Sequence, residues 1–244
     1  MGRREGSMEE ILDRNNLTIV YYTSNYLDDK KPAFLEATRK QLVSVTRGCP
    51  IITVSQKPMT FGTNICVGNI GRSHLNLYKQ ILIGCQAATT KYVALAEDDV
   101  LYSTNHFFDH VPSPRTFAYN MCKWSLYTWV KPPMYAFKHR AVINSLIGER
   151  DLFVASLEER FAKYPDPATT PLIFWADFGR LENHLGVTVR KTEEYYSKVP
   201  NIVFSHDNAF GYLLLGKHKK LDYVRAYDIP IWGKAYDILK LYET

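Results

Sequence analysis

The stretch KYVALAEDD, residues 91–99, joins a short apolar run directly to three consecutive acids. Its first six residues have the length and composition of a buried β-strand. A helical pattern over Arg72–Ala88 precedes it, with apolar residues on one face at Leu75, Tyr78, Leu82 and Cys85. The sequence therefore predicts a helix followed by a strand whose end carries Glu97, Asp98 and Asp99.

Two earlier strand patterns extend this arrangement toward the N-terminus. Leu17–Thr23 and Pro50–Ser55 are rich in β-branched and aromatic residues, and a helical pattern over Lys30–Arg47 separates them. Strands separated by single helices are typical of βαβ units, so we predict an α/β fold with a mainly parallel sheet flanked by helices. Ligands of such sheets bind at the C-terminal strand ends. Three polar ends are expected to line one crevice: Thr23-Ser24-Asn25, Ser55-Gln56-Lys57 and Glu97-Asp98-Asp99.

From residue 112 onward the regular alternation of strand and helix patterns ends. An aromatic, strand-like run over Phe117–Phe137 opens this second half of the chain, and we expect this half to extend the same sheet and bind a different ligand. The expected later elements are helices at Arg140–Gly148, Leu152–Tyr164 and Asp177–Leu185 and strands at Val187–Lys191 and Asn201–Phe204. We expect one domain from residue 8, with halves at 17–111 and 112–210 and a tail at 211–244. Residues 1–7 are interpreted as a cloning remnant before a natural start at Met8.

Composition excludes several classes of protein. The 244 residues are 46% hydrophobic, with 12 Phe, 17 Tyr and 4 Trp, which is too apolar and aromatic for a disordered chain. No apolar run reaches the roughly 18–20 residues of a membrane span, and the N-terminus has no signal-peptide pattern. The widely spaced cysteines favour reduced thiols in a cytoplasmic protein over a zinc ribbon or a disulfide framework: Cys49, Cys66, Cys85 and Cys122.

The net charge of +5 suits an anionic partner such as a nucleotide diphosphate, a nucleic acid or a membrane surface. The basic cluster Lys217–Lys220 is equally well read as a solvated face. The sequence lacks a dinucleotide fingerprint, a P-loop and a G-x-S-x-G elbow, which argues against a dehydrogenase, a P-loop ATPase and a serine hydrolase. Most aromatic residues of the second half are expected in the core, with Trp124 or Trp129 as the better candidate for stacking on a ligand.

Three adjacent acids after an apolar strand repel each other, and a divalent cation is the usual compensation. Mg²⁺ or Mn²⁺ typically takes one or two protein carboxylates together with phosphate oxygens of a substrate. A helix N-cap or a solvated turn is the alternative, because acids are also favourable at helix starts. The spacing alone leaves both interpretations open.

The order of long helix, apolar strand, acidic triplet and apolar residue resembles the D-x-D region of nucleotide-sugar glycosyltransferases with the GT-A fold. Glu97-x-Asp99 stands in place of D-x-D, a variation that occurs in that family. The resemblance extends to inverting, family-two-like enzymes of bacteria and their viruses through Asn69–Gln80, Tyr102–Phe107, Trp175–Arg180 and Pro200–His206. It implies a GT-A sheet, a Mn²⁺ or Mg²⁺ ion and a nucleotide-sugar donor.

The resemblance also implies roles for individual residues. The metal would be held by Asp99, with Glu97 as a further ligand, and by His206, which otherwise stands in an ordinary polar turn. The donor would contact the end of the first strand, two of the acids and the loop after the second strand: Tyr22, Thr23, Ser24, Asn25, Glu97, Asp98, Lys57, Asn69 and Arg72.

Inversion at an anomeric carbon needs one general base to deprotonate the acceptor hydroxyl. The resemblance places this base at Asp177, which could instead cap a helix running to Leu185. Glu182, one helical turn further on, is the reserve candidate for the same catalytic role.

The leading hypothesis is a metal-dependent, inverting transfer of a sugar from a UDP-sugar to a hydroxyl acceptor. A hydroxymethylated pyrimidine in DNA is one candidate acceptor, beside a small molecule, a protein or a cell-surface precursor. A nucleotidyltransferase is the second hypothesis, but it would normally carry a Gly-rich basic loop where Tyr22–Tyr26 stands. A non-catalytic sugar- or nucleic-acid-binding module is the third hypothesis, and it leaves the acids at 97–99 unexplained.

Overall fold

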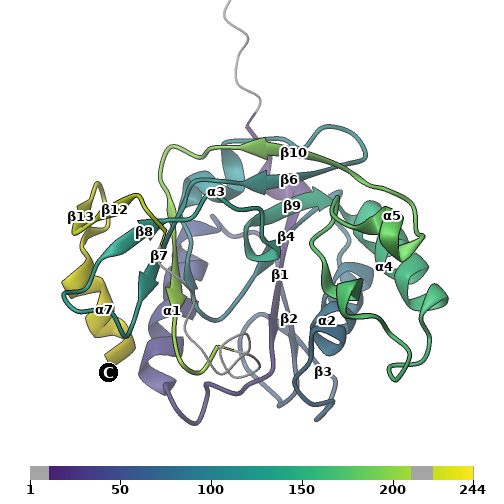
Figure 1. Ribbon diagram of the computed structural model, residues 1–244, viewed down its shortest axis with the longest axis horizontal. Helices are drawn as coiled ribbons and strands as arrows, with labels where there is room; N and C mark the ends of the chain where they lie inside the picture. Colours follow the sequence, from purple (N-terminus) through teal and green to yellow (C-terminus); the bar gives the residue numbers. More distant parts are fainter. Residues whose placement is uncertain (1–10, 210–221, 244) are drawn as a thin grey trace, which may run out of the picture.

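A seven-stranded sheet forms the centre of the molecule, in a computed structural model that describes residues 11–209 and 222–243. The strand order is β10-β6-β9-β4-β1-β2-β3 (Figure 1). All neighbouring strands are parallel except for β9, which runs antiparallel to both β4 and β6. The strands are β1 (Leu17–Thr23), β2 (Ile51–Ser55), β3 (Thr63–Cys66), β4 (Tyr92–Ala96), β6 (Thr116–Asn120), β9 (Leu146–Glu149) and β10 (Lys191–Tyr195).

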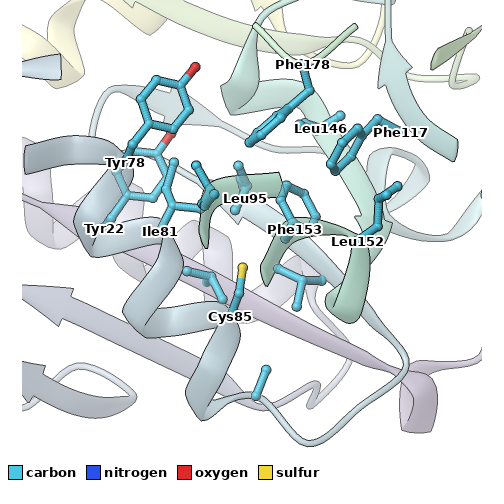
Figure 2. Packing of buried hydrophobic residues seen from close by; sticks show 14 of the residues in the cluster. Tyr22, Tyr78, Ile81, Cys85, Leu95, Phe117, Leu146, Leu152, Phe153 and Phe178 are labelled. Atoms are coloured by element: carbon cyan, nitrogen blue, oxygen red, sulfur yellow. The ribbon is translucent and has the colours of Figure 1, made fainter. Parts of the chain in front are cut away.

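Helices cover both faces of this sheet. Helices α2 (His74–Ala87) and α4 (Arg150–Lys163) pack against each other on one face, and α2 lies directly on β1 and β2. Figure 2 shows the buried cluster beneath them, where Ile81 and Cys85 of α2 and Phe153 of α4 surround Leu95 of β4. Helices α1 (Pro32–Val45) and α3 (Thr104–Phe108) contribute to the core on the opposite face.

A second, mixed sheet of five strands lies beside the first, in the order β12-β8-β7-β11-β5. Only the β7–β11 pair in it is parallel. Helix α7 (Ala235–Glu243) packs against α1 next to this sheet. The strands are β5 (Val100–Leu101), β7 (Lys123–Tyr127), β8 (Tyr135–Phe137), β11 (Asn201–Ser205) and β12 (Arg225–Ala226). The remaining elements are β13 (Asp228–Ile229), β14 (Gly233–Lys234), α5 (Glu182–Leu185) and the 3₁₀ turns Arg14–Asn16, Ile143–Ser145 and Leu172–Trp175.

The predicted α/β class is confirmed, and the strands and helices of residues 17–96 lie within one or two residues of their expected bounds. Strand β3 falls within a stretch expected to be a loop. Among the described residues no helix is long and apolar enough to cross a membrane. The predictions for residues 1–7, for Met8 and for the cluster at 217–220 fall outside the described residues.

Three of the elements expected in the second half are wrong. Residues 140–148 do not form a helix, because Leu146 and Ile147 are buried in β9 between β4 and β6. The strand expected at Val187–Lys191 instead runs over Lys191–Tyr195, and the helix expected from Asp177 begins at Glu182. The second half also does not simply extend the first sheet. After β6 the chain turns at Asn120, whose Oδ1 accepts the backbone N–H of Cys122, and it then enters the second sheet.

Helix α2 approaches the sheet so closely that Gly84 has no room for a side chain. A Cβ at this position would overlap Val20 and come within 3.2 Å of Cγ2 of Val54. We expect Gly84→Ala to destabilise the protein by about 1–3 kcal/mol, because overpacking outweighs the better helix propensity of alanine. Urea denaturation measures the change. Lys79→Ala, on the exposed side of the same helix, is the control and should shift stability by less than about 0.5 kcal/mol. Equal stability of the two variants would contradict the tight packing.

Candidate functional site

A cleft of about 340 Å³ opens where β1, β2 and β4 end, facing the end of β11 in the second sheet. The position agrees with the expected crevice at the C-terminal ends of parallel strands. The predicted residues that line it are Tyr22, Thr23, Ser24, Arg72, Glu97, Asp98, Asp99 and His206.

The acidic triplet is divided among separate sets of partners. Glu97 accepts hydrogen bonds from the Tyr22 hydroxyl (2.7 Å) and from Nδ2 of Asn144 (2.9 Å). Burial, reinforced by the negative charge of Asp99, raises the pKa of Glu97 to about 7. Both carboxylate oxygens of Glu97 are therefore engaged by the protein itself.

Asp98 has a second set of partners. Its carboxylate accepts hydrogen bonds from the hydroxyls of Tyr21 and Thr23, the latter at 2.7 Å, and Arg39 lies 3.9 Å away. Burial raises the pKa of Asp98 to about 6, although these hydrogen bonds and the Arg39 charge act in the opposite direction. Asp98 thus ties the end of β4 to β1 and α1.

Asp99 and His206 meet across the cleft. Oδ2 of Asp99 lies 3.3 Å from Nε2 of His206, and the backbone N–H of Phe204 donates to the Asp99 carbonyl at 2.8 Å. His206 is 2% exposed and packs against the ring of Tyr242, and neither of its ring nitrogens has a hydrogen-bond partner among the described residues. A buried imidazole whose nitrogens make no hydrogen bond within the described chain, and whose polar neighbour there is the Asp99 carboxylate, suits a nitrogen that binds a ligand from the cleft.

This pair fits a divalent cation. A carboxylate oxygen and an imidazole nitrogen are ligands that Mn²⁺ accepts, and phosphate oxygens of a substrate usually complete such a site. Within residues 11–209 and 222–243, no group of three or more His, Cys, Asp or Glu side chains is arranged to hold a metal by itself. Asp99 and His206 are therefore the two side chains that could hold a cation here, and Glu97 lies next to Asp99 in the chain with its oxygens already hydrogen-bonded.

Three residues predicted to bind the donor do not line the cleft. Asn25 is 3% exposed, and its Oδ1 accepts the backbone N–H groups of Gln56 and Lys57 at 2.8 and 2.9 Å, which joins the ends of β1 and β2. The Lys57 ammonium forms an exposed ion pair with Asp29 at 2.7 Å. Asn69 accepts the backbone N–H of Gly71 within its own turn.

Arg72 reaches from the start of α2 across to the loop after β11. Its guanidinium lies 3.7 Å from the ring centroid of Tyr26 and donates to the carbonyl of Asn208 at 3.2 Å. Burial lowers the pKa of Arg72, while Tyr26 and Asp98 act in the opposite direction. Since both Arg72 and Tyr26 line the cleft, a positive charge stands near its opening.

Sequence reasoning missed several polar residues of the cleft wall, among them Asn144, Lys123 and Lys138. Asn144 holds Glu97 through Nδ2, while its buried Oδ1 has no partner among the described residues. Lys123 and Lys138 face the cleft from β7 and from the residue after β8. Lys123 is the only charged residue in the stretch 116–130, a signal that the sequence offered. Trp124 packs on Phe137 and Trp129 on Tyr127, and neither tryptophan lines the cleft.

A second groove of about 620 Å³ shares the loop after β8 with the cleft. Asp177 lines neither of them, but the charges of Lys123 in the cleft and of Arg140 and Arg180 in the groove act on its carboxylate. The loop after β8 contributes Lys138 and Val142 to the cleft and Arg140 to the groove. The Asp177 side chain is 13% exposed, and one of its carboxylate oxygens lies 3.7 Å from the guanidinium of Arg180.

Asp177 keeps a raised pKa in this position. Burial raises it, and the positive charges of Arg140, Arg180 and Lys123 offset only part of the increase. The expected alternative role as a helix cap is not seen, since α5 begins at Glu182 and its N-cap position is Leu181.

Glu182 sits in a different environment from Asp177. It is 1% exposed and forms an ion pair with the equally buried Arg160 at 3.2 Å. It also accepts the backbone N–H groups of Gly179 (2.9 Å) and Arg190 (3.2 Å). These contacts fasten α5 to α4 and leave no side-chain surface for an acceptor.

Comparison with known proteins gives a fold-level likeness. No protein-family model and no curated protein matches this sequence. A solved glycosyltransferase involved in glycosylation of the major capsid of PBCV-1 is 9% identical over 77% of this chain and 91% of its own, with a TM-score of 0.45. A nucleotidyl transferase from Methanothermobacter is 14% identical over 78% and 88%, with a TM-score of 0.41.

A Drosophila β-1,4-galactosyltransferase 7, solved with manganese, UDP-galactose and xylobiose, is 13% identical over 73% of this chain and 64% of its own, with a TM-score of 0.39. Likenesses this distant concern the α/β fold and assign neither an activity nor a site residue.

The buried ion pair predicts a stability role for Glu182. We expect Glu182→Gln to lower the free energy of unfolding by about 3–5 kcal/mol, because it leaves the Arg160 charge buried without its partner. Urea denaturation at neutral pH measures this loss. Glu158→Gln, an exposed position on α4, is the control and should change stability by less than about 0.5 kcal/mol. A stable Glu182→Gln protein with lost turnover would instead favour a catalytic role.

Proposed function

We propose that this protein is a metal-dependent, inverting glycosyltransferase of the GT-A type that transfers a sugar from a UDP-sugar to a hydroxyl acceptor. The observation that carries the proposal is the pair Asp99 and His206 in the cleft, where Oδ2 lies 3.3 Å from Nε2 and neither imidazole nitrogen makes a hydrogen bond to the described residues. A hydroxymethylated pyrimidine in DNA is the acceptor we favour. The net charge of +5 and the basic side chains near Asp177 are consistent with that choice.

In this proposal Asp99 and His206 would hold Mn²⁺ or Mg²⁺, which would neutralise the charge of the leaving UDP. Arg72 would contact the diphosphate from the cleft opening, and Tyr22, Thr23 and Ser24 would contact the nucleoside at the end of β1. Glu97 and Asp98, whose oxygens are hydrogen-bonded to the protein, would keep Asp99 in position.

Asp177 would act as the general base. The acceptor hydroxyl attacks the anomeric carbon while its proton passes to the Asp177 carboxylate, and the bond from that carbon to the phosphate oxygen breaks to release UDP. A raised pKa favours this role, because a carboxylate becomes a better proton acceptor as its pKa moves toward the working pH. The charges of Lys123 from the cleft and of Arg140 and Arg180 from the groove act on Asp177, which supports a base placed near both substrates.

Assay of a panel of UDP-sugars with Mn²⁺, with and without hydroxymethyl-pyrimidine DNA, tests the activity directly. Release of pyrophosphate from a nucleoside triphosphate and a sugar phosphate, without sugar transfer, would favour a nucleotidyltransferase instead. Binding of UDP-sugar with no turnover on any acceptor would favour a non-catalytic binding module.

The metal assignment predicts a linked loss of metal and nucleotide binding. We expect Asp99→Asn and His206→Ala each to weaken UDP binding in Mn²⁺ at least about tenfold, equivalent to about 1.4 kcal/mol. Calorimetric titration with and without EDTA measures the effect. His184→Ala, at an exposed histidine, is the matched control and should bind UDP as the unchanged protein does. UDP affinity that is the same with and without EDTA would rule out the metal site.

The base assignment predicts a kinetic loss without a binding loss. Asp177→Asn should reduce kcat about 10²–10⁴-fold and leave UDP affinity unchanged, because the base acts only on the acceptor. The acidic limb of the pH–rate profile should lie above the range of an ordinary aspartate, because the pKa of Asp177 is raised, and it should vanish in the variant. Asp151→Asn, at an exposed carboxylate, is the control. Near-normal turnover of Asp177→Asn would remove it from the mechanism.

A further inference from the structure

Lys123 is a buried lysine at the inner wall of the cleft. It is 0% exposed, and its ammonium has one hydrogen-bond acceptor among the described residues, the carbonyl oxygen of Asn120 at 3.2 Å. No carboxylate of the described residues lies within ion-pair distance of it. An ammonium buried with so little compensation is unfavourable unless a ligand supplies negative charge.

More positive charge stands next to Lys123. Lys138 lies directly opposite it across the antiparallel β7–β8 pair, where the Lys138 N–H donates to the Lys123 carbonyl at 3.1 Å. Burial and the charges of Lys138 and Arg140 lower the pKa of Lys123 to about 8, although the charges of Asp177 and Glu194 act in the opposite direction. Like charges facing each other across two strands destabilise the pair. The fold maintains this repulsion at the wall that separates the cleft from the second groove.

The second groove continues the basic surface beyond Asp177. Arg140 and Arg180 line it, both exposed, and Glu194 is the one acid among its lining residues in the described chain. At its edge His139 lies parallel to the exposed ring of Tyr196, at an interplanar angle of 15°, with Nε2 2.8 Å from the tyrosine hydroxyl. A basic groove beside an exposed aromatic ring has the features that bind single-stranded nucleic acid.

We propose that the second groove binds phosphodiester groups of the acceptor through Arg140 and Arg180, with Lys123 and Lys138 facing the same acceptor from the cleft side. This inference rests on the proposed function, since it makes Asp177 the point where a base leaves the phosphodiester chain and enters the donor cleft. An enzyme that acts on a base takes the nucleotide out of the stack or binds a single strand, which a groove of this size and charge accommodates.

Binding of a fluorescein-labelled twelve-residue oligothymidylate, followed by fluorescence anisotropy between 50 and 200 mM NaCl, tests this inference. The double variant Arg140→Gln/Arg180→Gln should weaken binding at least about tenfold. The slope of log K against log salt should fall in magnitude by about 1.4, since each phosphate contact to a single strand contributes about 0.7. The double variant Lys40→Gln/Lys79→Gln removes the same charge from exposed sites outside both pockets, and it should change affinity less than about twofold.

Competition with thymidine 5′-monophosphate separates the two sources of phosphate. If thymidine 5′-monophosphate displaces the oligonucleotide only at millimolar concentration, the result supports a groove that binds a phosphodiester chain. Competition that matches the oligonucleotide and is lost in Arg140→Gln/Arg180→Gln keeps the phosphate chemistry but assigns it to a small phosphorylated acceptor. Equal losses in the groove variant and the control variant, or no binding of either probe, would overturn the inference.

Titration of UDP with Mn²⁺ in the same variants keeps the two proposals apart. Arg140→Gln/Arg180→Gln should leave UDP affinity unchanged, because neither arginine lines the donor cleft. If no form of the protein binds UDP but oligothymidylate binding still depends on Arg140 and Arg180, the donor assignment fails and the phosphate groove stands.

Discussion

The end of β4 places three carboxylates in succession at a point where the surrounding protein excludes water, and the rest of the site depends on how this charge is accommodated. Glu97 turns to one face of the sheet, where Tyr22 and Asn144 donate to it. Asp98 turns to the other, where Tyr21, Thr23 and Arg39 surround it. Desolvation is offset at both positions by hydrogen bonds supplied by the protein. All three acids line the cleft, but Asp99 differs in that its carboxylate lies beside His206 and accepts none of the side-chain hydrogen bonds that hold Glu97 and Asp98.

Strand β1 supplies three of these hydrogen-bond donors, and they stand on both faces of the strand. Tyr21 and Tyr22 point to opposite sides of the sheet because side chains alternate along a strand. Each reaches the acid of β4 that lies on its own side. The parallel register, in which Tyr21 pairs with Ala96, brings the polar ends of the two strands level with each other. The aromatic residues that give β1 its strand propensity therefore also hold the acidic strand end.

How far the sequence predicts this structure depends on whether the interactions are local. Helix α2 and strands β1, β2 and β4 follow from hydrophobic period and short-range chemistry, and their bounds were close to the expected ones. Strand β9 was missed because Leu146 and Ile147 acquire their environment from β4 and β6, distant in sequence. The division of the second half into two sheets depends on similarly long-range pairing.

The candidate site shows the same division between local and distant information. The acidic triplet and the histidine after β11 are visible in the sequence as polar residues at apolar strand ends. The partner of Glu182 is not, because Arg160 lies 22 residues away on another helix, and a buried ion pair leaves no periodic signal. Lys123 is a lone charge in an aromatic run, a signal that the sequence analysis did not use, and only the pairing of β7 with β8 shows that Lys138 faces it.

The two sheets contribute different halves of the site, and the chain passes between them more than once. The short connection from β4 to β5 is the one that carries the acidic triplet of the site. Asp99 follows β4 of the first sheet, and the next two residues, Val100 and Leu101, form β5 and pair antiparallel with β11 of the second sheet. This pairing fixes the distance between Asp99 and His206, because His206 directly follows β11. A cation held by both side chains would bind only the docked arrangement of the sheets, and so would stabilise that arrangement by its own binding free energy. The acidic strand end is thus a stretch whose charges are costly to bury, and it is also a point where the chain passes from the first sheet into the second.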